Sequence, residues 1–345
     1  MLSAYADSGV DIDAGELFVA MLKERIAAAW PEVGKEIGGF AGSVQFPALT
    51  NKVRCGADGS GTMAIVAALC DQYEVIGTAA AAMSLVDTYV GGALPVGLLD
   101  VIDVGKLVPE KHIRIIDGLI QGCKLAGSAR LIGGETAELP DMFRHSWMVN
   151  VNTAAIGFPD PCLLTGNIRP GMTVWGWRSE GPASNGFSLI RRALQLKGRP
   201  SLARKRLTRY SPDLRGSLQE ALLVPVPIWI NQIEIQRSVG TRFAGHAHIT
   251  GGGLVDNIPR ILPESCKVVL DRSTWERSAI FPIIQREGNV SAEEMDRVFN
   301  QGLMVVSVLD SSGKEPTTPN ILPIGTVEKR GEGERQVQFT GVFNN

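Results

Sequence analysis

Leu94-Pro-Val-Gly-Leu-Leu-Asp-Val-Ile102 is a largely apolar run, and it predicts a buried β-strand. A helix is predicted next, over 109–126, and it ends at Gly127. A second strand, Arg130-Leu-Ile132, then runs directly into the glycine-rich segment 133–138. A strand, a helix and a strand in this order indicate a mixed α/β fold, built from alternating layers.

The alternation of helices and strands continues toward both ends of the chain. On the N-terminal side we expect a helix over 16–30, a loop at 38–42, a short strand before Asp58, a helix over 75–90 and a strand over 147–157. Beyond residue 171 we expect strand 172–177, a helix from about 185, helix 218–237, strand 242–250, helices 277–287 and 291–300, and strands 303–309, 320–327 and 335–343. Proline and glycine cluster at 159–171, which predicts a boundary between domains 1–165 and 166–345.

The composition narrows the classes of protein that the chain can represent. A chain of 345 residues is longer than a domain with a single hydrophobic core usually is, which favours two domains. A net charge of −2 argues against a protein that coats nucleic acid over its whole surface. The five cysteines form no C-x-x-C pair, which indicates reduced thiols and not a disulfide framework or a zinc site. Without a secretory signal or an apolar run of membrane-spanning length, the sequence predicts a cytoplasmic protein with no membrane partner.

Four clusters rich in glycine or acidic residues are candidate ligand sites: 9–15, 58–63, 133–136 and 181–186. The most informative is Asp58-Gly-Ser-Gly-Thr-Met63, because backbone N–H groups in a glycine-rich turn can cradle phosphate oxygens. Asp58 would suit Mg2+, which prefers carboxylate oxygen. Met63 stands where such a loop needs a cation, and it can neither pair with phosphate nor donate a hydrogen bond. Each cluster on its own is also compatible with an ordinary tight turn.

Three carboxylates of the first domain, Asp58, Asp87 and Glu135, lie at or near the ends of predicted strands or helices. If they converge, they repel one another unless cations occupy the site. The combination therefore indicates an Mg2+–nucleotide site. Asp13 taken alone is better interpreted as a helix cap.

His246 and His248 lie two residues apart on a predicted strand, so their side chains share one face. This spacing can ligate a metal, but no nearby cysteine or carboxylate completes a ligand set. Packed histidines are the preferred interpretation. The four histidines of the chain also support no Ser–His–Asp or Cys–His nucleophile arrangement.

Residues 191–215 form the one strongly basic island of the sequence, with a single acid, Asp213. Its nine basic residues are Arg191, Arg192, Lys197, Arg199, Arg204, Lys205, Arg206, Arg209 and Arg215. A solvated helix end and loop is the simpler interpretation. The alternative is a docking surface for a protein or nucleic-acid partner, such as RNA or an acidic protein, or for a phosphate-rich ligand.

Several longer motifs point to a known family. They are Tyr5-Ala-Asp-Ser-Gly-Val-Asp-Ile-Asp-Ala-Gly15, Gly133-Gly-Glu-Thr-Ala-Glu-Leu-Pro140, Ser184-Asn-Gly186, His248-Ile-Thr-Gly-Gly-Gly-Leu254 and Asn257-Ile-Pro-Arg-Ile-Leu-Pro263. In this order, across nearly the whole chain, they resemble the aminoimidazole ribonucleotide synthetase family, also called phosphoribosylformylglycinamidine cyclo-ligase. The resemblance implies a two-domain α/β fold whose N-terminal domains pair into a homodimer with a shared β-barrel.

The resemblance also implies an activity and a site. ATP would activate the amide oxygen of formylglycinamidine ribonucleotide, and ring closure would yield aminoimidazole ribonucleotide, ADP and phosphate. The nucleotide site and the dimer contact would lie in domain 1–165, with ATP and Mg2+ as cofactors. The implied cofactor-binding residues are Gly9, Asp11, Asp13, Asp58, Gly59, Gly61, Thr62, Gly133, Gly134, Thr136, Ser184, Asn185, Gly251 and Gly252. The implied metal ligands are again Asp58, Asp87 and Glu135.

The chain departs from the family pattern at positions that would balance phosphate charge. Ala6 replaces a lysine, Met63 replaces the lysine that ends the loop, Val86 replaces an asparagine and Ala183 replaces a histidine. Pro225-Val-Pro227 also stands in place of Pro-Thr-Arg. A hydrogen bond to a charged group contributes about 1.5–3 kcal/mol, so one lost cation weakens binding or rate about ten- to a hundred-fold.

These departures leave two functional hypotheses. The favoured one is a catalytically impaired cyclo-ligase-like protein that acts as a structural or regulatory subunit without a cofactor. The alternative is an active ATP-dependent cyclo-ligase, in which Lys52 or Arg54, both close to the loop in sequence, compensates for a lost cation.

Overall fold

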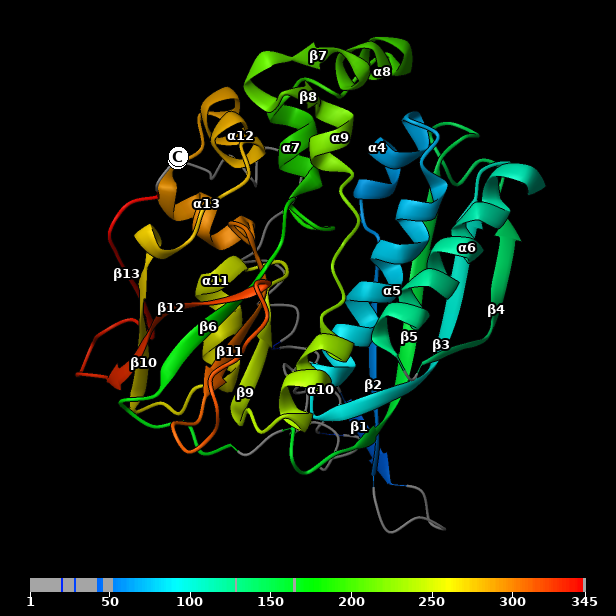
Figure 1. The fold of residues 1–345 in the computed structure, drawn as a ribbon. Coiled ribbons are helices and arrows are strands. Elements are labelled where there is room, and N and C mark those ends of the chain that lie inside the picture. Colours follow the sequence, from blue (N-terminus) through cyan, green and yellow to red (C-terminus); the bar gives the residue numbers. More distant parts are fainter. Residues whose placement is uncertain are drawn as a thin grey trace. The chain divides into compact units, whose positions relative to one another are not determined.

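The computed structural model describes residues 20, 28, 42–45, 52–127, 129–163 and 166–343 (Figure 1). The chain divides into two compact units. Unit 1 comprises Met1–Pro161 with Phe187–Leu189, and unit 2 comprises Cys162–Gly186 with Ile190–Asn345. The predicted helix 16–30 lies outside the described residues apart from Ala20 and Ala28, which are helical, and of the predicted loop 38–42 only Gly42 is described.

Unit 1 contains a five-stranded sheet covered by helices. The strand order is β1 (Gly42–Gln45), β2 (Lys52–Gly59), β5 (Val149–Pro159), β3 (Ala93–Val104) and β4 (Arg130–Glu138). Only β3 and β4 are parallel, and α6 (Pro109–Ala126) forms the crossover that a parallel pair requires. The predicted strand–helix–strand unit is thus confirmed, including the helix end at Gly127. Helices α4 (Met63–Leu69) and α5 (Tyr73–Val90) complete the unit, and α5 packs on β2, β5 and β3 (Figure 1).

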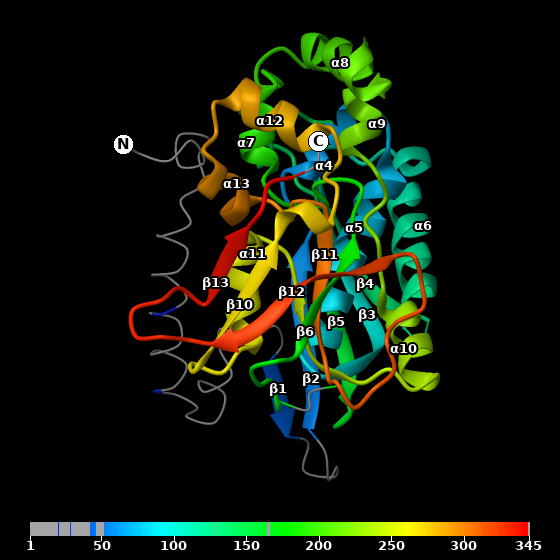
Figure 2. The same cartoon turned by 60° about the vertical axis from the view of Figure 1, so that its left-hand side comes forward.

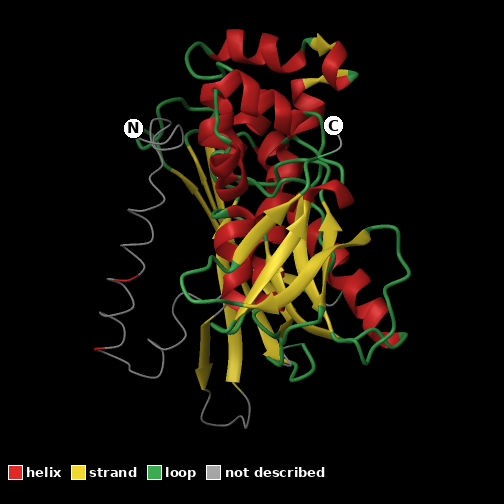
Figure 3. Cartoon of the chain, turned by 90° about the vertical axis from the view of Figure 1, so that its left-hand side faces the viewer, coloured by secondary structure: helices red, strands yellow, loops and turns green. Residues whose placement is uncertain are grey.

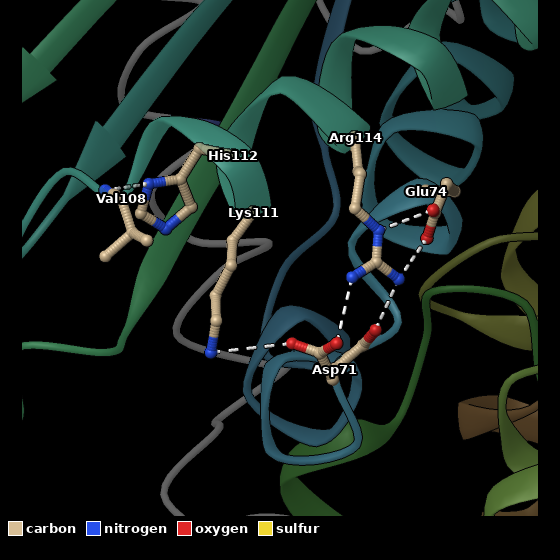
Figure 4. Close-up of polar contacts among 6 residues, drawn as sticks. All are labelled: Asp71, Glu74, Val108, Lys111, His112 and Arg114. Carbon is tan, nitrogen blue, oxygen red and sulfur yellow. Dashed lines mark hydrogen bonds and ion pairs between the residues drawn. The ribbon is translucent and has the colours of Figure 1, made fainter.

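Helices α5 and α6 pack closely because each places a glycine at their crossing. A Cβ atom added at Gly118 would overlap the carbonyl oxygen of Glu74, and one at Gly77 would overlap the carbonyl oxygen of Ile115. Arg114 joins the same two helices, since its Nε donates to Glu74 Oε1 at 2.5 Å and its Nη1 to Asp71 Oδ2 at 2.9 Å (Figure 4). These hydrogen bonds from Arg114 lower the pKa of both carboxyl groups.

The start of α6 is fixed by a histidine. The backbone N–H of Val108 donates to His112 Nδ1 at 3.1 Å, so the imidazole accepts a hydrogen bond at the helix N-terminus (Figure 4). His112 is buried against Tyr73, and its burial, together with the neighbouring Lys111, lowers the pKa of the imidazole. The histidine is therefore held in the neutral form in which it can accept that hydrogen bond.

Unit 2 contains a six-stranded mixed sheet. Its order is β13 (Val337–Thr340), β10 (Cys266–Asp271), β12 (Ile321–Lys329), β6 (Thr173–Arg178), β11 (Leu303–Leu309) and β9 (Phe243–His248) (Figure 2). The helices of the unit are α8 (Pro200–Thr208), α9 (Leu218–Leu222), α10 (Ile230–Ser238), α11 (Gly253–Asn257), α12 (Ile280–Gly288) and α13 (Ala292–Val298) (Figure 3). Helix α7 (Phe187–Ala193) is divided, with Phe187–Leu189 in unit 1 and its remaining residues in unit 2, and β7 (Tyr210–Ser211) forms a short ribbon with β8 (Gly216–Ser217). Every residue of β11 is buried, which places this strand in the core.

Three features of the fold differ from the sequence prediction. The single helix predicted over 218–237 is wrong, because α9 ends at Leu222 and α10 begins at Ile230, with Pro225 and Pro227 between them. Proline removes a backbone donor and clashes with the preceding turn, so the helix cannot continue through this segment. Helices α4, α8 and α11, strands β1 and β10 and the β7–β8 ribbon are additional elements. The glycine-rich segment 133–138 belongs to β4 and is not a loop.

None of the helices within the described ranges is long and apolar enough to cross a lipid bilayer.

Candidate functional site

A row of polar residues crosses the sheet of unit 1. Asp58 on β2 pairs with Thr153 on β5, Thr153 pairs with Asp100 on β3, and Asp100 pairs with Gly134 on β4. Ser84 of α5 contacts this row of residues. Its Oγ accepts a hydrogen bond from the backbone N–H of Asp58 at 3.1 Å and lies 2.6 Å from Thr153 Oγ1. The row brings two carboxylates of unit 1, Asp58 and Asp100, onto the helix-covered side of the sheet.

Asp100 is a site candidate that sequence reasoning missed. Its side chain is only 5% exposed, and burial raises the pKa of the carboxyl group. Gly134 makes room for it, since a Cβ atom added at Gly134 would overlap the Asp100 carboxylate. The signal in the sequence is one acid inside an apolar strand, which is costly to bury unless it has a function.

The structure does not bring the three predicted metal ligands together in one chain. Asp58 on β2 and Glu135 on β4 are separated by two intervening strands, which corresponds to about 14 Å at the usual strand spacing. Asp87 lies in the last turn of α5. No group of three or more His, Cys, Asp or Glu side chains in the described part of the chain is placed to hold a metal ion. The role of the three carboxylates as metal ligands stays a prediction.

The loop after Asp58 forms a turn, and a core methionine follows it where the family pattern has a lysine. Asp58 Oδ1 accepts from the N–H of Gly59 at 2.7 Å, and Gly61 and Thr62 form the turn that leads into α4. Met63 is the first residue of α4 and only 1% exposed, so its side chain belongs to the core. Val86, the replacement in α5, is equally buried.

The positions of Lys52 and Arg54 do not support the hypothesis that one of them replaces the lysine lost at Met63. Lys52 and Arg54 lie at the start of β2, four or more residues before Asp58 on an extended strand. That spacing corresponds to about 13 Å or more between backbone positions. The structure therefore places neither of these two backbone positions next to Asp58.

In unit 2, two predicted segments come together. Ser184 and Asn185 lie between β6 and α7, and Gly251 and Gly252 lie between β9 and α11. A Cβ atom added at Gly251 would lie 3.9 Å from Asn185 Oδ1, so the two loops are neighbours. Ser184 Oγ and Asn185 Nδ2 are buried and have no hydrogen-bond partner among the residues that the structure describes. Buried polar atoms are seldom left unsatisfied, so this pair is a candidate contact for a polar ligand.

Asn257 holds the glycine-rich loop in shape, a role that the sequence analysis does not assign. Its Nδ2 donates to the carbonyl oxygens of Gly253 at 2.8 Å, Gly251 at 3.1 Å and Thr250 at 3.4 Å. The side chain is fully buried. One amide group thus fixes three backbone carbonyls of the loop that lies beside Asn185.

The interpretation of His246 and His248 as packed histidines is confirmed, because both are buried on β9. His246 Nδ1 lies 2.7 Å from Ser307 Oγ, and burial lowers the pKa of His246 to about 3. An imidazole held neutral in the core supports the sheet. It is not available for proton transfer near neutral pH.

The remaining predicted site residues are divided between β4 and the undescribed part of the chain. Gly133 and Thr136 lie on β4 with Gly134 and Glu135. Gly9, Asp11 and Asp13 lie outside the described residues. Their roles as cofactor-binding residues stay predictions.

Comparison with known proteins identifies relatives of the whole chain. Residues 46–158 match the N-terminal domain of AIR synthase related protein, and residues 169–338 match its C-terminal domain. The chain is 40% identical to phosphoribosylformylglycinamidine cyclo-ligase of Pseudothermotoga lettingae, covering 89% of each chain. It is 39% identical to the protein of that name from Geotalea daltonii, covering 90% of this chain and 89% of the relative.

Solved structures show the same fold at lower sequence identity. AaThiL complexed with AMPPCP and TMP has a TM-score of 0.61 and 16% identity, covering 92% of each chain. Hydrogenase maturation protein HypE in complex with ATP has a TM-score of 0.57 and 16% identity, covering 92% of this chain and 91% of HypE. At this identity the likeness concerns the fold alone.

Proposed function

The chain belongs to the AIR synthase related protein family, and on this premise we propose that it is an active ATP-dependent cyclo-ligase. It would convert formylglycinamidine ribonucleotide to aminoimidazole ribonucleotide. The observation that carries the proposal is its identity to the named cyclo-ligases over most of both chains. Mg2+ as the counter-ion of ATP and a cytoplasmic location are parts of the same proposal.

The residues of unit 2 fit a polar ligand such as the nucleotide. Ser184 and Asn185 offer two buried polar atoms that no other described residue satisfies, and Gly251 leaves open space beside Asn185. Asn257 keeps the Gly251 carbonyl and its neighbours in place. ATP use is also supported by the fold relatives, of which AaThiL is complexed with AMPPCP and HypE with ATP.

When bound, ATP supplies phosphoryl activation of the substrate's amide oxygen. Ring closure then requires a proton to leave the attacking nitrogen. Among the described acids of unit 1, Asp100 is the one whose pKa is raised, by burial, and this makes its carboxylate the better proton acceptor. We therefore assign Asp100 as the proton acceptor, with Gly134 giving the carboxylate its room.

A second candidate function, a catalytically impaired structural or regulatory subunit, is favoured by specific replacements. Met63 and Val86 place apolar side chains in the core where the family pattern has a lysine and an asparagine. Ala183 has a φ of 56°, a left-handed conformation in which histidine is tolerated better than alanine. Ala183→His therefore suits the backbone conformation, although Ala183 is only 6% exposed and its neighbours must make room for an imidazole, whereas Met63→Lys would bury an ammonium group.

The homodimer is a further part of the proposal, and the sheet of unit 1 supports it. While α5 covers one face, the other face exposes apolar side chains, including Ile132 at 58% and Phe158 at 52%. Leu99 and Val101 on β3 extend this patch. An apolar patch of this kind commonly marks a protein interface. Val101→Asp should convert a dimer to a monomer in a light-scattering measurement, and an unchanged mass would exclude this face.

Calorimetric titration of Mg-ATP separates the two candidate functions. Binding in the micromolar range to the wild-type protein, lost in Asn185→Leu, is expected for the active enzyme. An absence of heat at millimolar ATP would exclude it. Under the impaired hypothesis, binding would be absent in the wild type and would appear in Ala183→His.

A further inference from the structure

The charge of the chain is divided unevenly, and the candidate site does not account for the division. The basic island 191–215 carries nine Lys or Arg and one acid, a net charge of +8. The rest of the chain carries 25 Lys or Arg and 35 Asp or Glu, a net charge of −10. A local charge of this size, opposite in sign to the remainder, favours an anionic partner at this segment.

Helix α8 presents much of this charge to solvent. Ala203 and Leu207, one turn apart, are buried and hold the helix on unit 2, so the opposite face points outward. Arg204, Lys205 and Arg209 are exposed and make no ion pair with any residue that the structure describes. Cations that have no acidic neighbour are available to phosphate groups.

An exposed aromatic ring and a cavity adjoin the basic helix. Tyr210 follows directly after Arg209, and its side chain is 66% exposed. It lines a cavity of about 420 Å³ together with Arg206, Arg286, Leu218 and Ile283. Arg206 is held in place, since its Nη1 donates to the carbonyl oxygen of Gln195 at 2.5 Å. Asp213 and Glu287 also line the cavity and both pair with Arg286, so the basic part of the rim is Arg206 and Arg209 beside Tyr210, and part of the lining is apolar.

We propose that this surface binds single-stranded nucleic acid, with phosphates along α8 and one base stacked on Tyr210 at the mouth of the cavity. Basic side chains that track a backbone, combined with an aromatic ring for a base, are the two elements of single-strand recognition. An acidic peptide without apolar or aromatic side chains, such as polyglutamate, would use the cations but not the exposed ring. A duplex offers the cations its phosphates but keeps its bases stacked.

Fluorescence anisotropy with a labelled twelve-nucleotide oligouridylate tests the proposal on the full-length protein. Four phosphate contacts, from Arg204, Lys205, Arg206 and Arg209, predict a salt slope of about −2.8, because each contributes about −0.7 for a single strand. Affinity should then fall about 50-fold between 50 and 200 mM salt. Tyr210→Ala should weaken binding about five- to a hundred-fold, the effect of one stacked base, whereas Tyr210→Phe should retain it.

Two triple variants that remove the same charge, one in the basic island and one elsewhere, separate the effect of the island from the effect of net charge. Arg204→Gln, Lys205→Gln and Arg209→Gln together should reduce the salt slope by about 2. Lys314→Gln, Lys329→Gln and Arg335→Gln remove the same charge from exposed positions elsewhere on unit 2 and should leave the slope unchanged.

Three outcomes would overturn the proposal. They are absence of binding at 50 mM salt, equal losses in the two triple variants, and polyglutamate or duplex binding as tightly as the oligouridylate with no effect of Tyr210→Ala. Unchanged thermal unfolding of the Tyr210 variants would show that a loss of affinity comes from the contact and not from misfolding.

Discussion

Lowering the pH from 7 to 5 should destabilise unit 2 through His246. The imidazole is buried on β9, the strand that leads into the glycine-rich loop of the candidate site. Ser307 Oγ accepts from Trp177 Nε1 at 2.9 Å, and its own hydrogen is free to be donated to His246 Nδ1 at 2.7 Å. This arrangement suits a neutral imidazole, so protonation must work against both burial and the hydrogen bond.

The size of the effect follows from the difference in pKa between the folded and unfolded states. Burial lowers the pKa of His246 to about 3, while an unfolded histidine titrates at about 6.5. Between these values the unfolded state binds a proton that the folded state does not, so the free energy of unfolding falls as the pH falls. At pH 5 the loss is about 2 kcal/mol, and at pH 7 it is close to zero.

Urea unfolding followed by tryptophan fluorescence measures this loss, since Trp175, Trp177 and Trp229 lie in unit 2. His246→Asn keeps a polar atom near the position of Nδ1 but removes the titrating ring. The variant should be less stable than the wild type at pH 7, and its deficit should shrink by about 2 kcal/mol at pH 5. His145→Asn, in unit 1, controls for the substitution itself. If the deficit of His246→Asn is the same at both pH values, the reasoning is refuted.

Three further substitutions test the packing and the site. Gly118→Ala should lower the free energy of unfolding by about 1–3 kcal/mol, because the added Cβ atom would overlap the backbone of α5. Gln121 is exposed on α6, and Gln121→Ala should have little effect in the same urea titration. Asp100→Asn should abolish turnover but stabilise the protein at pH 7, because it removes a carboxylate whose ionisation is opposed by burial. The gain in stability should vanish below pH 4, where the carboxyl group is protonated in both states. A loss of stability at pH 7 would contradict this account. Asn257→Ala removes three hydrogen bonds to the glycine-rich loop and should cost about 1–3 kcal/mol and weaken Mg-ATP binding in calorimetry; unchanged affinity would separate Asn257 from the site.

Much of the fold could be predicted because local and tertiary signals agree. Helix α6 combines an amphipathic pattern with a glycine just after its last residue, and the structure ends the helix there. The apolar run 303–309 is strand β11, and both have the same limits. The prediction of one helix over 218–237 is wrong, because Pro225 and Pro227 interrupt the helix although the apolar residues around them favour it.

The candidate site could be predicted only in part, because local sequence alone does not determine which side chains are buried or which strands pair. Ser184, Asn185 and Gly251 enter as candidate cofactor-binding residues only through the family resemblance, and that their loops are neighbours is known only from the structure. Asp100 gives only a weak signal in the sequence, one acid inside an apolar strand, and its setting is defined by the pairing of β3 with β4, which places Gly134 next to its carboxylate. Met63 looked like a defect in a phosphate loop, whereas the structure makes it a core residue of α4.

The proposed cyclo-ligase activity is tested most directly by measuring aminoimidazole ribonucleotide formed from formylglycinamidine ribonucleotide and Mg-ATP by the purified wild-type protein. We expect continuous turnover, with one ADP released for each product molecule, and its loss in Asp100→Asn. A protein that is folded and binds both substrates but forms no product, or that hydrolyses ATP without ring closure, would contradict the proposed function.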